Sequence, residues 1–517
     1  MTATLLADLY HPRMAQQYFA LNLTHLQAVA VCYTRKNMAG NGFQVAASSE
    51  AILQACEQFR VAPEVLERLA REAIDGTPVF TPAFLEYLGH LQGLKLTIEM
   101  VPDGGIYFPN EAKVRVSGPI VDVLLFEDAV LNAGVADLVA TRMARLRQAA
   151  RGIPIVEFGL RRAPGADAAQ KGAYAAVVAG AVGTSNVAAG VEHDLKLYGT
   201  QAHFFLQSLI GLYTGARLTE ADAERTGYPA GTVITPTIAE RLAMMLWASL
   251  NPKDLILLTD TINSLRSGIP NAIWVFQQAQ RRGWTIKGIR LDSGIMKRIV
   301  PEARAMLDAA GFTRDRCKIM VTDSVNEQRL TQYVNDNLPI DLLGIGGAFY
   351  TGEKAETGLV YKLVAVQNLH GEMVRVMKLT DDPEKGGILG DKVVRIYDGD
   401  GKAAGDVVIA AEGDPFEQAI APGSDRVLLY NPACPELERK WVKGFSARPL
   451  LELHMKDGVR TRQPRPVDLI AREHDRELAT LCRVLDGWER YPVNLSQHLY
   501  DRNSAMLAEY RAGMAEE

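Results

Sequence analysis

The sequence IKGIRLDSG at residues 286–294 is a short β-rich run that ends in charged residues, a serine and a glycine. A segment of helical period follows it and ends at Gly311, a residue that suits the position just after a helix. The same unit, a β-rich run and then a helical segment, recurs between about residues 150 and 365. The pattern predicts parallel strands joined by helical crossovers.

Eight β-rich runs carry this pattern. The expected strands are residues 155–158, the 176–182 stretch, 195–198, 255–258, 286–291, 319–321, 342–345 and 360–366. Parallel strands of this kind form either an open doubly wound sheet or a closed barrel, and about eight units favour the barrel. We therefore expect an α/β protein whose centre is an irregular, TIM-like (β/α) barrel.

Helix signals separate the expected strands. Thr235 and Pro236 suit an N-cap and a first helical position, and Asn251, which precedes a proline, ends that helix. Ser324 and Glu327 form a capping box ahead of another apolar helical face. These signals predict helices that begin near residues 236 and 325.

The flanks of the chain lack this alternation. Residues 1 to about 125 and 370–517 mix helices with strands such as residues 113–116. We expect residues 1–125 and 369–517 to form the two parts of one α+β lobe, and residues 126–368 to form the barrel with the active site.

The composition excludes several classes of protein. The 517 residues are 48% hydrophobic and 23% charged, which suits a large globular core. With 56 basic and 61 acidic residues the net charge is −5, so the chain has no electrostatic signature for nucleic acid or for an anionic membrane. The N-terminus lacks a signal-peptide pattern, and no apolar stretch approaches the roughly 20 residues that span a bilayer.

The cysteines indicate a reducing compartment. Five of them are scattered along the chain without a CxxC pair: Cys32, Cys56, Cys317, Cys434 and Cys482. Their odd number and their spacing favour reduced core thiols over disulfides or metal ligands. A cytoplasmic location is therefore expected.

Polar and glycine residues gather directly after the expected strands. The segments are EFGLRR at 157–162, GTSN at 183–186, GTQAH at 199–203, TDT at 259–261, RLDSG at 290–294 and GIGG at 344–347. Because the carboxyl ends of barrel strands converge on one mouth, we expect all six segments there. Arginines, an imidazole, carboxylates and glycine-lined backbone N–H groups suit a phosphorylated anionic substrate. Gly346 and Gly347 follow the seventh run, where barrels often bind phosphate.

Each of these motifs also has a simpler structural explanation. A glycine pair after a strand is usually a turn, and His203 beside two phenylalanines can be a core imidazole. Asp260 and Ser185 can each cap the helix that follows. Their joint placement after successive strands is what favours a catalytic site.

At these residues the sequence resembles the nicotinate phosphoribosyltransferase family, which is similar to the nicotinamide phosphoribosyltransferases and more distantly to the quinolinate phosphoribosyltransferases. The resemblance runs nearly end to end. Its segments are Asp8-Leu9-Tyr10 with Met14-Ala15, Arg35-Lys36, Val116-Ser117-Gly118-Pro119, Phe158-Gly159-Leu160-Arg161-Arg162, Gly183-Thr184-Ser185-Asn186, Gly199-Thr200 with Ala202-His203, Arg290 with Asp292-Ser293-Gly294, Tyr361-Lys362-Leu363-Val364, and Tyr491-Pro492-Val493 with Leu495-Ser496.

The resemblance implies a type II phosphoribosyltransferase barrel beside a lobe built from both chain ends, in a homodimer with shared active sites. It implies that Phe158 stacks on a pyridine ring from one side and Tyr10 of the partner chain from the other. Arg290 and Asp292 match positions that hold the ribose and the product, and Arg35 matches one near the pyrophosphate. We expect further substrate contacts from Arg161 and Thr200, which stand in the matching motifs, and from Gly346 and Gly347 because of their place after the seventh run.

The resemblance also implies ATP-dependent catalysis. His203 matches a histidine that the family phosphorylates with ATP, and Asp260 is our candidate for the group that orients the imidazole. His203, Asp260 and Asp292 are thus the expected catalytic residues. Mg²⁺ is expected with the pyrophosphate, bridged mainly through substrate oxygens and water, and no metal-ligating side chain is assigned.

Ser185 decides between nicotinic acid and nicotinamide. Nicotinamide-specific relatives carry an aspartate at the matching position. A carboxylate about 4 Å from the nicotinate carboxylate would cost roughly 4 kcal/mol at an effective dielectric near 20. Ser185 removes this repulsion and can donate a hydrogen bond, so we expect a nicotinate phosphoribosyltransferase of NAD salvage that uses nicotinic acid and phosphoribosyl pyrophosphate.

Other functions remain as alternatives. One is a nicotinamide phosphoribosyltransferase, and another is a nucleotide-sensing barrel without catalysis, which the retained His203, Arg290 and Asp292 argue against. An aldolase lacks a candidate Schiff-base lysine at the strand ends.

The sequence departs from the family pattern at several positions. The departures are Ile295 in place of a second aspartate, Thr322-Asp323 in place of Ser-Asn, Gly347 in place of a common threonine, and the loop at 37–40. Metal or phosphate handling can differ there.

Overall fold

The structure is a computed structural model. It describes residues 5–38, 42–322, 324–351, 356–377, 390–411, 413–414, 416, 426–431, 438–481 and 491–515. Asp323, Cys434, Cys482 and residues 39–40 of the loop at 37–40 lie outside the described residues.

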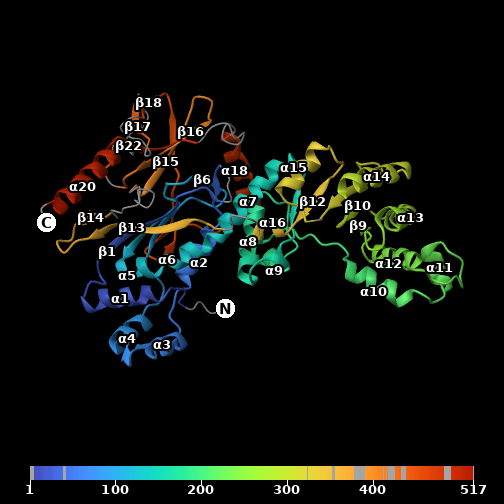
Figure 1. Cartoon of the computed structure of the whole chain (residues 1–517), viewed down its shortest axis with the longest axis horizontal. Helices are drawn as coiled ribbons and strands as arrows, with labels where there is room; N and C mark the ends of the chain where they lie inside the picture. Colours follow the sequence, from blue (N-terminus) through green and yellow to red (C-terminus); the bar gives the residue numbers. More distant parts are fainter. Residues whose placement is uncertain are drawn as a thin grey trace. The chain divides into compact units, whose positions relative to one another are not determined.

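The chain divides into two compact units. One comprises residues 1–141 and 353–517, and the other comprises residues 142–352. Figure 1 colours the chain along its sequence, so the blue and the orange-to-red parts belong to the first unit and the green-to-yellow part to the second. The domain boundaries predicted from the sequence, at residues 125 and 368, stay predictions.

The first unit contains strands from both ends of the chain. Its seven-stranded antiparallel sheet has the order β14-β13-β1-β7-β5-β20-β21, and a six-stranded mixed sheet has the order β18-β17-β22-β16-β15-β19. The strands of the larger sheet are β1 (Gln27–Thr34), β5 (Thr97–Met100), β7 (Val114–Pro119), β13 (Leu359–Gln367), β14 (Met373–Arg375), β20 (Glu452–Lys456) and β21 (Val459–Arg460). Those of the smaller are β15 (Lys392–Tyr397), β16 (Ala403–Ile409), β17 (Arg426–Tyr430), β18 (Arg439–Lys443), β19 (Ser446–Pro449) and β22 (Val493–Ser496).

Helices and two short pairs of antiparallel strands complete this unit. The helices are α1 (Tyr10–Ala20), α2 (Ser49–Glu57), α3 (Pro63–Ala70), α4 (Pro82–Gly89), α5 (Ile120–Leu125), α6 (Glu127–Ala133), α18 (Val467–Thr480) and α20 (Gln497–Ala515), and α7 (Val135–Ala150) continues into the second unit. The short pairs are β2 (Gln44–Val45) with β6 (Ile106–Tyr107), and β3 (Ala73–Ile74) with β4 (Thr77–Pro78).

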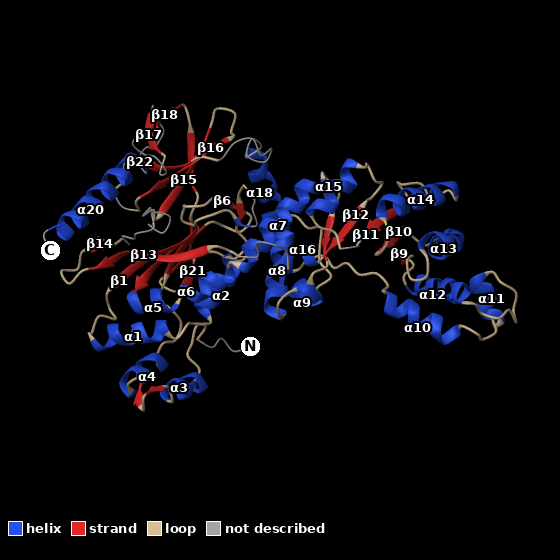
Figure 2. Cartoon of the chain, in the orientation of Figure 1, coloured by secondary structure: helices blue, strands red, loops and turns tan. Residues whose placement is uncertain are grey.

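The second unit is built on a parallel five-stranded sheet in the order β8-β12-β11-β10-β9. The strands are β8 (Ile155–Glu157), β9 (Leu255–Leu258), β10 (Ile286–Leu291), β11 (Lys318–Val321) and β12 (Leu342–Ile345). The helices are α8 (Ala166–Val178), α9 (Val187–His193), α10 (His203–Tyr213), α11 (Glu220–Thr226), α12 (Pro236–Leu250), α13 (Ile269–Arg281), α14 (Met296–Ala309), α15 (Glu327–Asn335) and α16 (Gly347–Tyr350), with a 3₁₀ turn at Leu160–Arg162 and a π-helix at Ser264–Gly268. Figure 2 shows these strands in red among the helices of the unit.

Two isolated parallel bridges extend the sheet beyond β8. Glu157 pairs with Thr184, and Thr184 pairs with Leu197. Among the described residues no pairing joins Leu197 to β9, so the sheet is not closed there into a barrel. The prediction of an α/β unit with parallel strands is confirmed, whereas the closed barrel is not detected.

Most of the expected strands of this sheet are confirmed. The runs at 255–258, 286–291 and 342–345 are β9, β10 and β12, and β8 and β11 differ from the expected runs by one residue at one end. Only Leu197 of the 195–198 run pairs with a neighbour.

Two of the expected runs are not strands of this sheet. Residues 176–178 are the last turn of α8, an alanine-rich segment whose intrinsic preference for helix outweighs its apolar character. Gly172 of that helix contacts the Tyr350 ring, so close packing also favours a helix without bulky side chains. The run at 360–366 lies in β13 of the first unit, where it pairs antiparallel with β1.

The predicted helix signals were correct in two of three places. The Thr235 hydroxyl accepts from the Ile238 N–H at 3.4 Å and the helix ends at Asn251, as predicted. Gly311 follows α14 with φ +85°, a left-handed conformation that glycine adopts without strain. The capping box at Ser324 is wrong, because the side chain of Asn326 caps α15 by accepting from the Arg329 N–H at 2.9 Å.

The parallel strands form a buried sheet that supports the loops at their carboxyl ends. The inward residues Leu257, Ile289, Ile319 and Leu343 are fully buried. Full burial of such a side chain stabilises the fold by about 1.5–3 kcal/mol. Over the described residues, no helix is both long enough and apolar enough to cross a bilayer.

Three of the five cysteines fall within the described residues, and the prediction of core thiols is confirmed for them. Cys32, Cys56 and Cys317 are free and buried. Burial raises the pKa of each thiol to about 12, so these side chains are protonated at neutral pH.

Gly288 tests how tightly β10 and β11 must approach. A Cβ at this position would overlap the carbonyl oxygen of Lys318, its register partner in β11. We expect Gly288→Ala to lower the free energy of unfolding by about 1–3 kcal/mol, measured from the urea midpoint. Gly211→Ala on α10 is the control, because a Cβ there has no neighbour within 4 Å. Equal midpoints in the two variants would contradict the assigned packing.

Candidate active site

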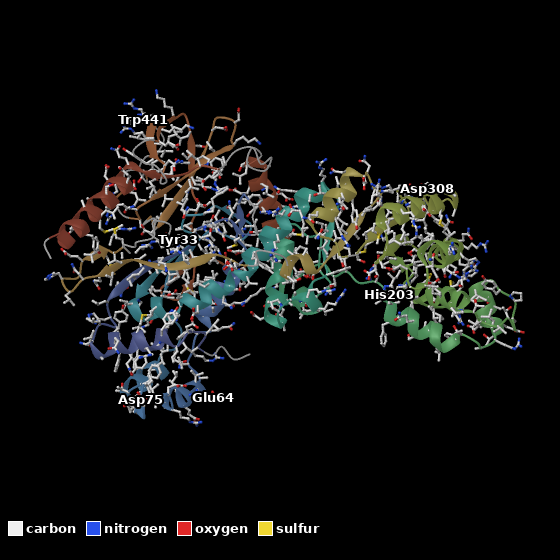
Figure 3. All side chains as sticks on the ribbon, in the orientation of Figure 1. Tyr33, Glu64, Asp75, His203, Asp308 and Trp441 are labelled. Carbon is white, nitrogen blue, oxygen red and sulfur yellow. The ribbon has the colours of Figure 1, made fainter. Side chains whose placement is uncertain are left out.

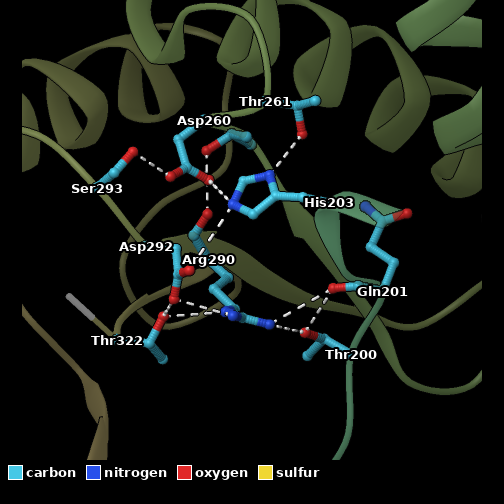
Figure 4. Close-up of polar contacts among 10 residues, drawn as sticks. Thr200, Gln201, His203, Asp260, Thr261, Arg290, Asp292, Ser293 and Thr322 are labelled. Atoms are coloured by element: carbon cyan, nitrogen blue, oxygen red, sulfur yellow. Dashed lines mark hydrogen bonds and ion pairs between the residues drawn. The ribbon is translucent and has the colours of Figure 1, made fainter. Parts of the chain in front are cut away.

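The carboxyl ends of β9, β10 and β11 bring together side chains that are distant in the sequence. Asp260 follows β9, Arg290 and Asp292 lie at the end of β10, and Thr322 follows β11. His203, which Figure 3 labels, is the first residue of α10. Figure 4 shows that these residues form one connected group of polar contacts.

Arg290 is the centre of this group. Its Nε donates to the Thr322 hydroxyl at 3.0 Å, its Nη1 to the Thr200 hydroxyl at 2.9 Å, and its Nη2 to the Asp292 carboxylate at 2.9 Å. The three partners come from three different loops, so the planar guanidinium fixes their relative positions (Figure 4).

Asp292 is held in its ionised form. Burial acts to raise its pKa, but hydrogen bonds from Thr322 and Arg290, together with the electrostatic interaction with the Arg290 cation, outweigh it and lower the pKa below the ordinary value. The Thr322 hydroxyl and Arg290 Nη2 donate to the same oxygen of Asp292, Oδ1. The site therefore keeps a negative charge next to a fixed cation.

His203 lies between a hydroxyl and two carboxylates. Its Nδ1 is 3.1 Å from the Thr261 hydroxyl, and its Nε2 is 3.7 Å from both Asp260 Oδ1 and Asp292 Oδ2. The Asp260 side chain is only 2% exposed, and its other oxygen accepts from the Ser293 hydroxyl at 2.5 Å. The sequence analysis missed Thr261, although it stands beside Asp260 in the strand-end segment at 259–261.

A cavity of about 450 Å³ opens beside this group. A volume of this size suits a small-molecule ligand. Its walls come from four of the strand-end loops: Phe158, Arg161, Arg162, Arg290, Asp292, Thr322, Ser324, Val325, Asn326, Gly344, Gly346, Gly347, Ala348 and Thr351. Arg161 and Arg162 are exposed. The cavity thus combines one aromatic ring with three guanidinium groups.

The glycines of this cavity make room for Phe158. A Cβ at Gly344 would lie 2.7 Å from the Phe158 ring, and one at Gly346 would lie 2.5 Å from the Phe158 carbonyl oxygen. A Cβ at Gly347 would meet only the Thr351 hydroxyl, at 3.7 Å. Gly344 and Gly346 are therefore required for packing, whereas Gly347 faces open space.

Glu157 joins the Phe158 turn to the segment that contains Ser185. Its carboxylate accepts from the Gly159 N–H and from the Thr184 hydroxyl, and its carbonyl oxygen accepts from the Ser185 N–H at 3.0 Å. Burial raises the pKa of Glu157, and these two hydrogen bonds to its carboxylate oppose the rise. Ser185 is thus held beside the strand that carries Phe158.

The alternative interpretation, that Ser185 caps the helix that follows it, is wrong. The side chain of Asn186 caps α9 by accepting from the Ala189 N–H at 3.3 Å. Ser185 is half-buried and is not among the residues that line the cavity.

The structure places ten of the predicted site residues in one unit and two in the other. Phe158, Arg161, Arg290, Asp292, Gly346 and Gly347 line the cavity, Thr200 contacts Arg290, His203 and Asp260 adjoin Asp292, and Ser185 adjoins the strand before Phe158. Tyr10, at the start of α1 with 49% of its surface exposed, and Arg35, after β1, belong to the first unit. Among the described residues, no group of three or more His, Cys, Asp or Glu side chains could hold a metal ion.

Parallel strands whose ends carry a fixed arginine, an ionised aspartate, an imidazole and an arginine-lined cavity define an enzyme that handles phosphorylated anions. Comparisons with known families specify the class. Three family models match the chain: the nicotinate phosphoribosyltransferase N-terminal domain at residues 5–133, the nicotinate phosphoribosyltransferase family at 153–398, and the nicotinate phosphoribosyltransferase C-terminal domain at 391–503.

Individual relatives agree along the whole chain. The nicotinate phosphoribosyltransferase of Bacillus subtilis (strain 168) is 30% identical over 99% of this chain and 96% of its own, and that of Bos taurus is 30% identical over 97% and 96%. The crystal structure of human nicotinic acid phosphoribosyltransferase superimposes with a TM-score of 0.80 at 26% identity, over 97% of this chain and 100% of its own. The chain belongs to the nicotinate phosphoribosyltransferase family, and it is an enzyme of that type.

The family resemblance stated from the sequence motifs is thereby confirmed. The alternatives of a nicotinamide phosphoribosyltransferase and of a barrel without catalysis are not favoured by these relatives. A nicotinate-nucleotide pyrophosphorylase from Pyrococcus furiosus shares the fold at 17% identity, with a TM-score of 0.60 over 92% of this chain and 95% of its own.

Thr322→Val tests the charge state of the site. This variant lacks the hydroxyl that donates to Asp292, so burial acts with less opposition and the pKa of Asp292 is expected to rise, measured by ¹³C NMR titration of labelled carboxyls. The ionised carboxylate stabilises the wild-type fold above the unfolded-state pKa and loses this effect as pH falls through the lower folded-state pKa. The acid limb of the stability profile should therefore move to higher pH.

Thr351→Val is the matched control for this measurement. It removes a hydroxyl of the same cavity that donates to the Gly347 carbonyl oxygen at 3.0 Å. If both variants leave the Asp292 titration unchanged, the proposed role of Thr322 is wrong.

Proposed function

We propose that the protein joins nicotinic acid to phosphoribosyl pyrophosphate, forming nicotinate mononucleotide and pyrophosphate in NAD salvage. The observation that carries this proposal is the fixed Arg290–Asp292 pair at the rim of a cavity lined by Phe158 and two further arginines. The family membership of the chain supports it, because relatives covering almost its whole length are named nicotinate phosphoribosyltransferases.

The cavity offers complementary surfaces to the two substrates. The Phe158 ring, which lies against Gly344, gives a flat apolar face for the pyridine. Arg161 and Arg162 offer guanidinium forks to the phosphates, and the open backbone at Gly347 lets N–H donors approach them. Asp292 accepts hydrogen bonds from ribose hydroxyls, while Arg290 keeps it ionised.

The transfer itself is a substitution at the anomeric carbon of the ribose. The pyridine nitrogen of nicotinate forms the new N–C bond, and the bond from that carbon to the pyrophosphate oxygen breaks. Positive charge develops on the sugar as the pyrophosphate leaves. The carboxylate of Asp292 stabilises this charge, and the arginines stabilise the negative charge of the leaving group.

His203 is the proposed acceptor of the γ-phosphoryl group of ATP. When Nδ1 carries the proton and donates to the Thr261 hydroxyl, the lone pair of Nε2 is free to attack phosphorus. The N–P bond forms, the bond from phosphorus to the ADP oxygen breaks, and ADP leaves. Asp260 and Asp292, each 3.7 Å from Nε2, then lie beside the phosphohistidine and favour its hydrolysis by repulsion.

The site suits a Mg²⁺ ion that is bound mainly by substrate oxygens and only in part by the protein. The described residues offer no group of three or more His, Cys, Asp or Glu ligands, whereas the ionised Asp292 at the cavity is one carboxylate that would hold the ion. When bound, Mg²⁺ would neutralise part of the pyrophosphate charge.

The finer architecture is also part of the proposal. The bridges at Thr184 and Leu197 continue the parallel sheet, which supports an irregular (β/α) barrel. The homodimer with shared active sites, with Tyr10 of one chain stacking on the pyridine bound by the other, is supported by the 49% exposure of the Tyr10 side chain in the single chain. Arg35 is proposed to contact the pyrophosphate.

The function is tested with the purified protein, phosphoribosyl pyrophosphate and Mg²⁺, with and without ATP. Nicotinate and nicotinamide are offered separately, and mononucleotide and pyrophosphate are measured. We expect product from nicotinate, stimulated by ATP, and far less from nicotinamide. No mononucleotide from either substrate would refute the proposal.

In the same assay, His203→Ala should lose ATP stimulation and keep the ATP-independent rate, because only the phosphoryl acceptor is gone. Wild type incubated with γ-³²P-labelled ATP should carry acid-labile label that the variant lacks. Full ATP stimulation in the variant, with no label on wild type, would show that His203 is not the acceptor.

Ser185→Asp tests the choice of acid over amide. A carboxylate about 4 Å from the substrate carboxylate costs roughly 4 kcal/mol, so kcat/KM for nicotinate should fall by up to about a thousandfold. The loss for nicotinamide should be much smaller. Ser249→Asp, at an exposed position of α12, is the control. Equal losses for both substrates would mean that Ser185 does not face the ring.

A further inference from the structure

We propose that Glu240, a buried residue outside the cavity, positions the imidazole of His203 by way of the π-helix Ser264–Gly268 and the segment 259–261. The inference rests on the proposed function, because its effect on turnover is expected in the ATP-dependent step. Glu240 is a positioning residue, since its side chain touches other residues of the protein.

Glu240 lies on α12 with its side chain fully buried. Its Oε2 accepts from the Ser267 hydroxyl and from the Asn271 amide at 2.9 Å, and the Ile262 backbone also acts on this carboxyl by lowering its pKa against the effect of burial. Burial raises the pKa of this carboxyl. A buried acid costs free energy that an apolar side chain of similar size would not, so packing alone does not account for it.

The Asn271 side chain is oriented so that its NH₂ group, and not its oxygen, faces Glu240. The Nε of Arg241 donates to Asn271 Oδ1 at 3.0 Å, which turns the amide NH₂ toward the carboxylate. The same NH₂ also donates to the Thr237 carbonyl oxygen at 3.0 Å. The hydrogen bond from Asn271 to Glu240 therefore has a fixed direction and joins α12 to α13. The hydrogen bond from Ser267 joins Glu240 to the π-helix, and we call these two bonds the Glu240 tether.

The π-helix closes the loop after β9 as one wide turn. The N–H groups of Ser267 and Gly268 both donate to the Asn263 carbonyl oxygen, at 3.0 and 2.9 Å. Gly268 lies against the backbone of Thr259, where a Cβ would overlap the Thr259 carbonyl oxygen. Single π-turns are rare and are often found at functional sites. A shift of Ser267 would therefore move the backbone at 259–261.

That segment carries both groups that face His203. Thr261 lies 3.1 Å from Nδ1 and Asp260 lies 3.7 Å from Nε2 (Figure 4). On its other side, Thr259 is bound to the Arg290 carbonyl oxygen through its N–H at 3.1 Å and its hydroxyl at 3.2 Å. The segment is thus held between β10 and the π-helix, and Glu240 holds the π-helix.

Three variants test this tether. Glu240→Ala and Ser267→Ala break it, whereas Glu240→Gln keeps an oxygen that accepts both hydrogen bonds. We expect the first two to slow formation of phosphohistidine about tenfold or more, because a misplaced nucleophile loses its alignment. Glu240→Gln should restore most of the rate. The ATP-independent rate and the KM for nicotinate should stay near the wild-type values in all three.

Glu224→Gln, at an exposed position of α11 in the same unit, is the control for the change of charge. If Glu240→Ala does not fold, Ser267→Ala removes a single oxygen and tests the same tether. Wild-type phosphorylation in Ser267→Ala would overturn the inference, as would an equal loss of the ATP-independent rate.

A readout without turnover separates this inference from the proposed function. In ¹⁵N NMR of the labelled imidazole, wild-type His203 should show the tautomer with its proton on Nδ1, and Ser267→Ala should show a mixture of tautomers. An unchanged spectrum overturns the inference even if His203 is phosphorylated. If wild type forms no phosphohistidine but the spectrum changes, the ATP step of the proposed function fails and the positioning role stands.

Discussion

The hydrogen bonds of the Arg290 guanidinium are the constraint on which the rest of the site depends. One planar cation contacts Thr200, Asp292 and Thr322, and these residues belong to loops that are far apart in the chain. A guanidinium fork offers its donors in fixed directions, so the three acceptors cannot move independently. The network also sets the charge of the site, because the pKa of Asp292 stays low despite burial. In the proposed mechanism, substrate recognition and charge stabilisation thus share one origin.

This network depends on the buried, closely packed sheet whose strand ends carry it. The parallel strands β9 to β12 are buried and close together, and Gly288 allows β10 to approach β11 at Lys318, the start of the strand whose other end leads to Thr322. Gly344 lets the Phe158 ring lie against β12, and Gly346 makes room for the Phe158 backbone. Removing water from such a site strengthens each electrostatic contact within it. The packing of small residues therefore controls the chemistry of charged ones.

The sequence predicted the parts of this arrangement that are local. Strands β9 and β12 are apolar runs with clear limits, and β10 is a short β-rich run that ends at Asp292-Ser293-Gly294, so their bounds follow from pattern alone. The helical end of α8 could not be predicted in this way, because an alanine-rich segment also fits the pattern of an apolar strand. Its contact with Tyr350, which favours the helix, is known only from the structure. The assignment of β13 to the sheet of the first unit depends on pairing with β1, about 330 residues away in the chain, which no local pattern contains.

The candidate site shows the same division between local and long-range information. The strand-end motifs located Arg290, Asp292, His203 and Asp260, because polar residues after parallel strands converge. Thr261 and Thr322 carry hydrogen bonds that depend on the spacing of separate loops, and a threonine in a loop has no distinctive signal of its own. Gly346 was identified for phosphate binding, yet its nearest constraint is the Phe158 backbone.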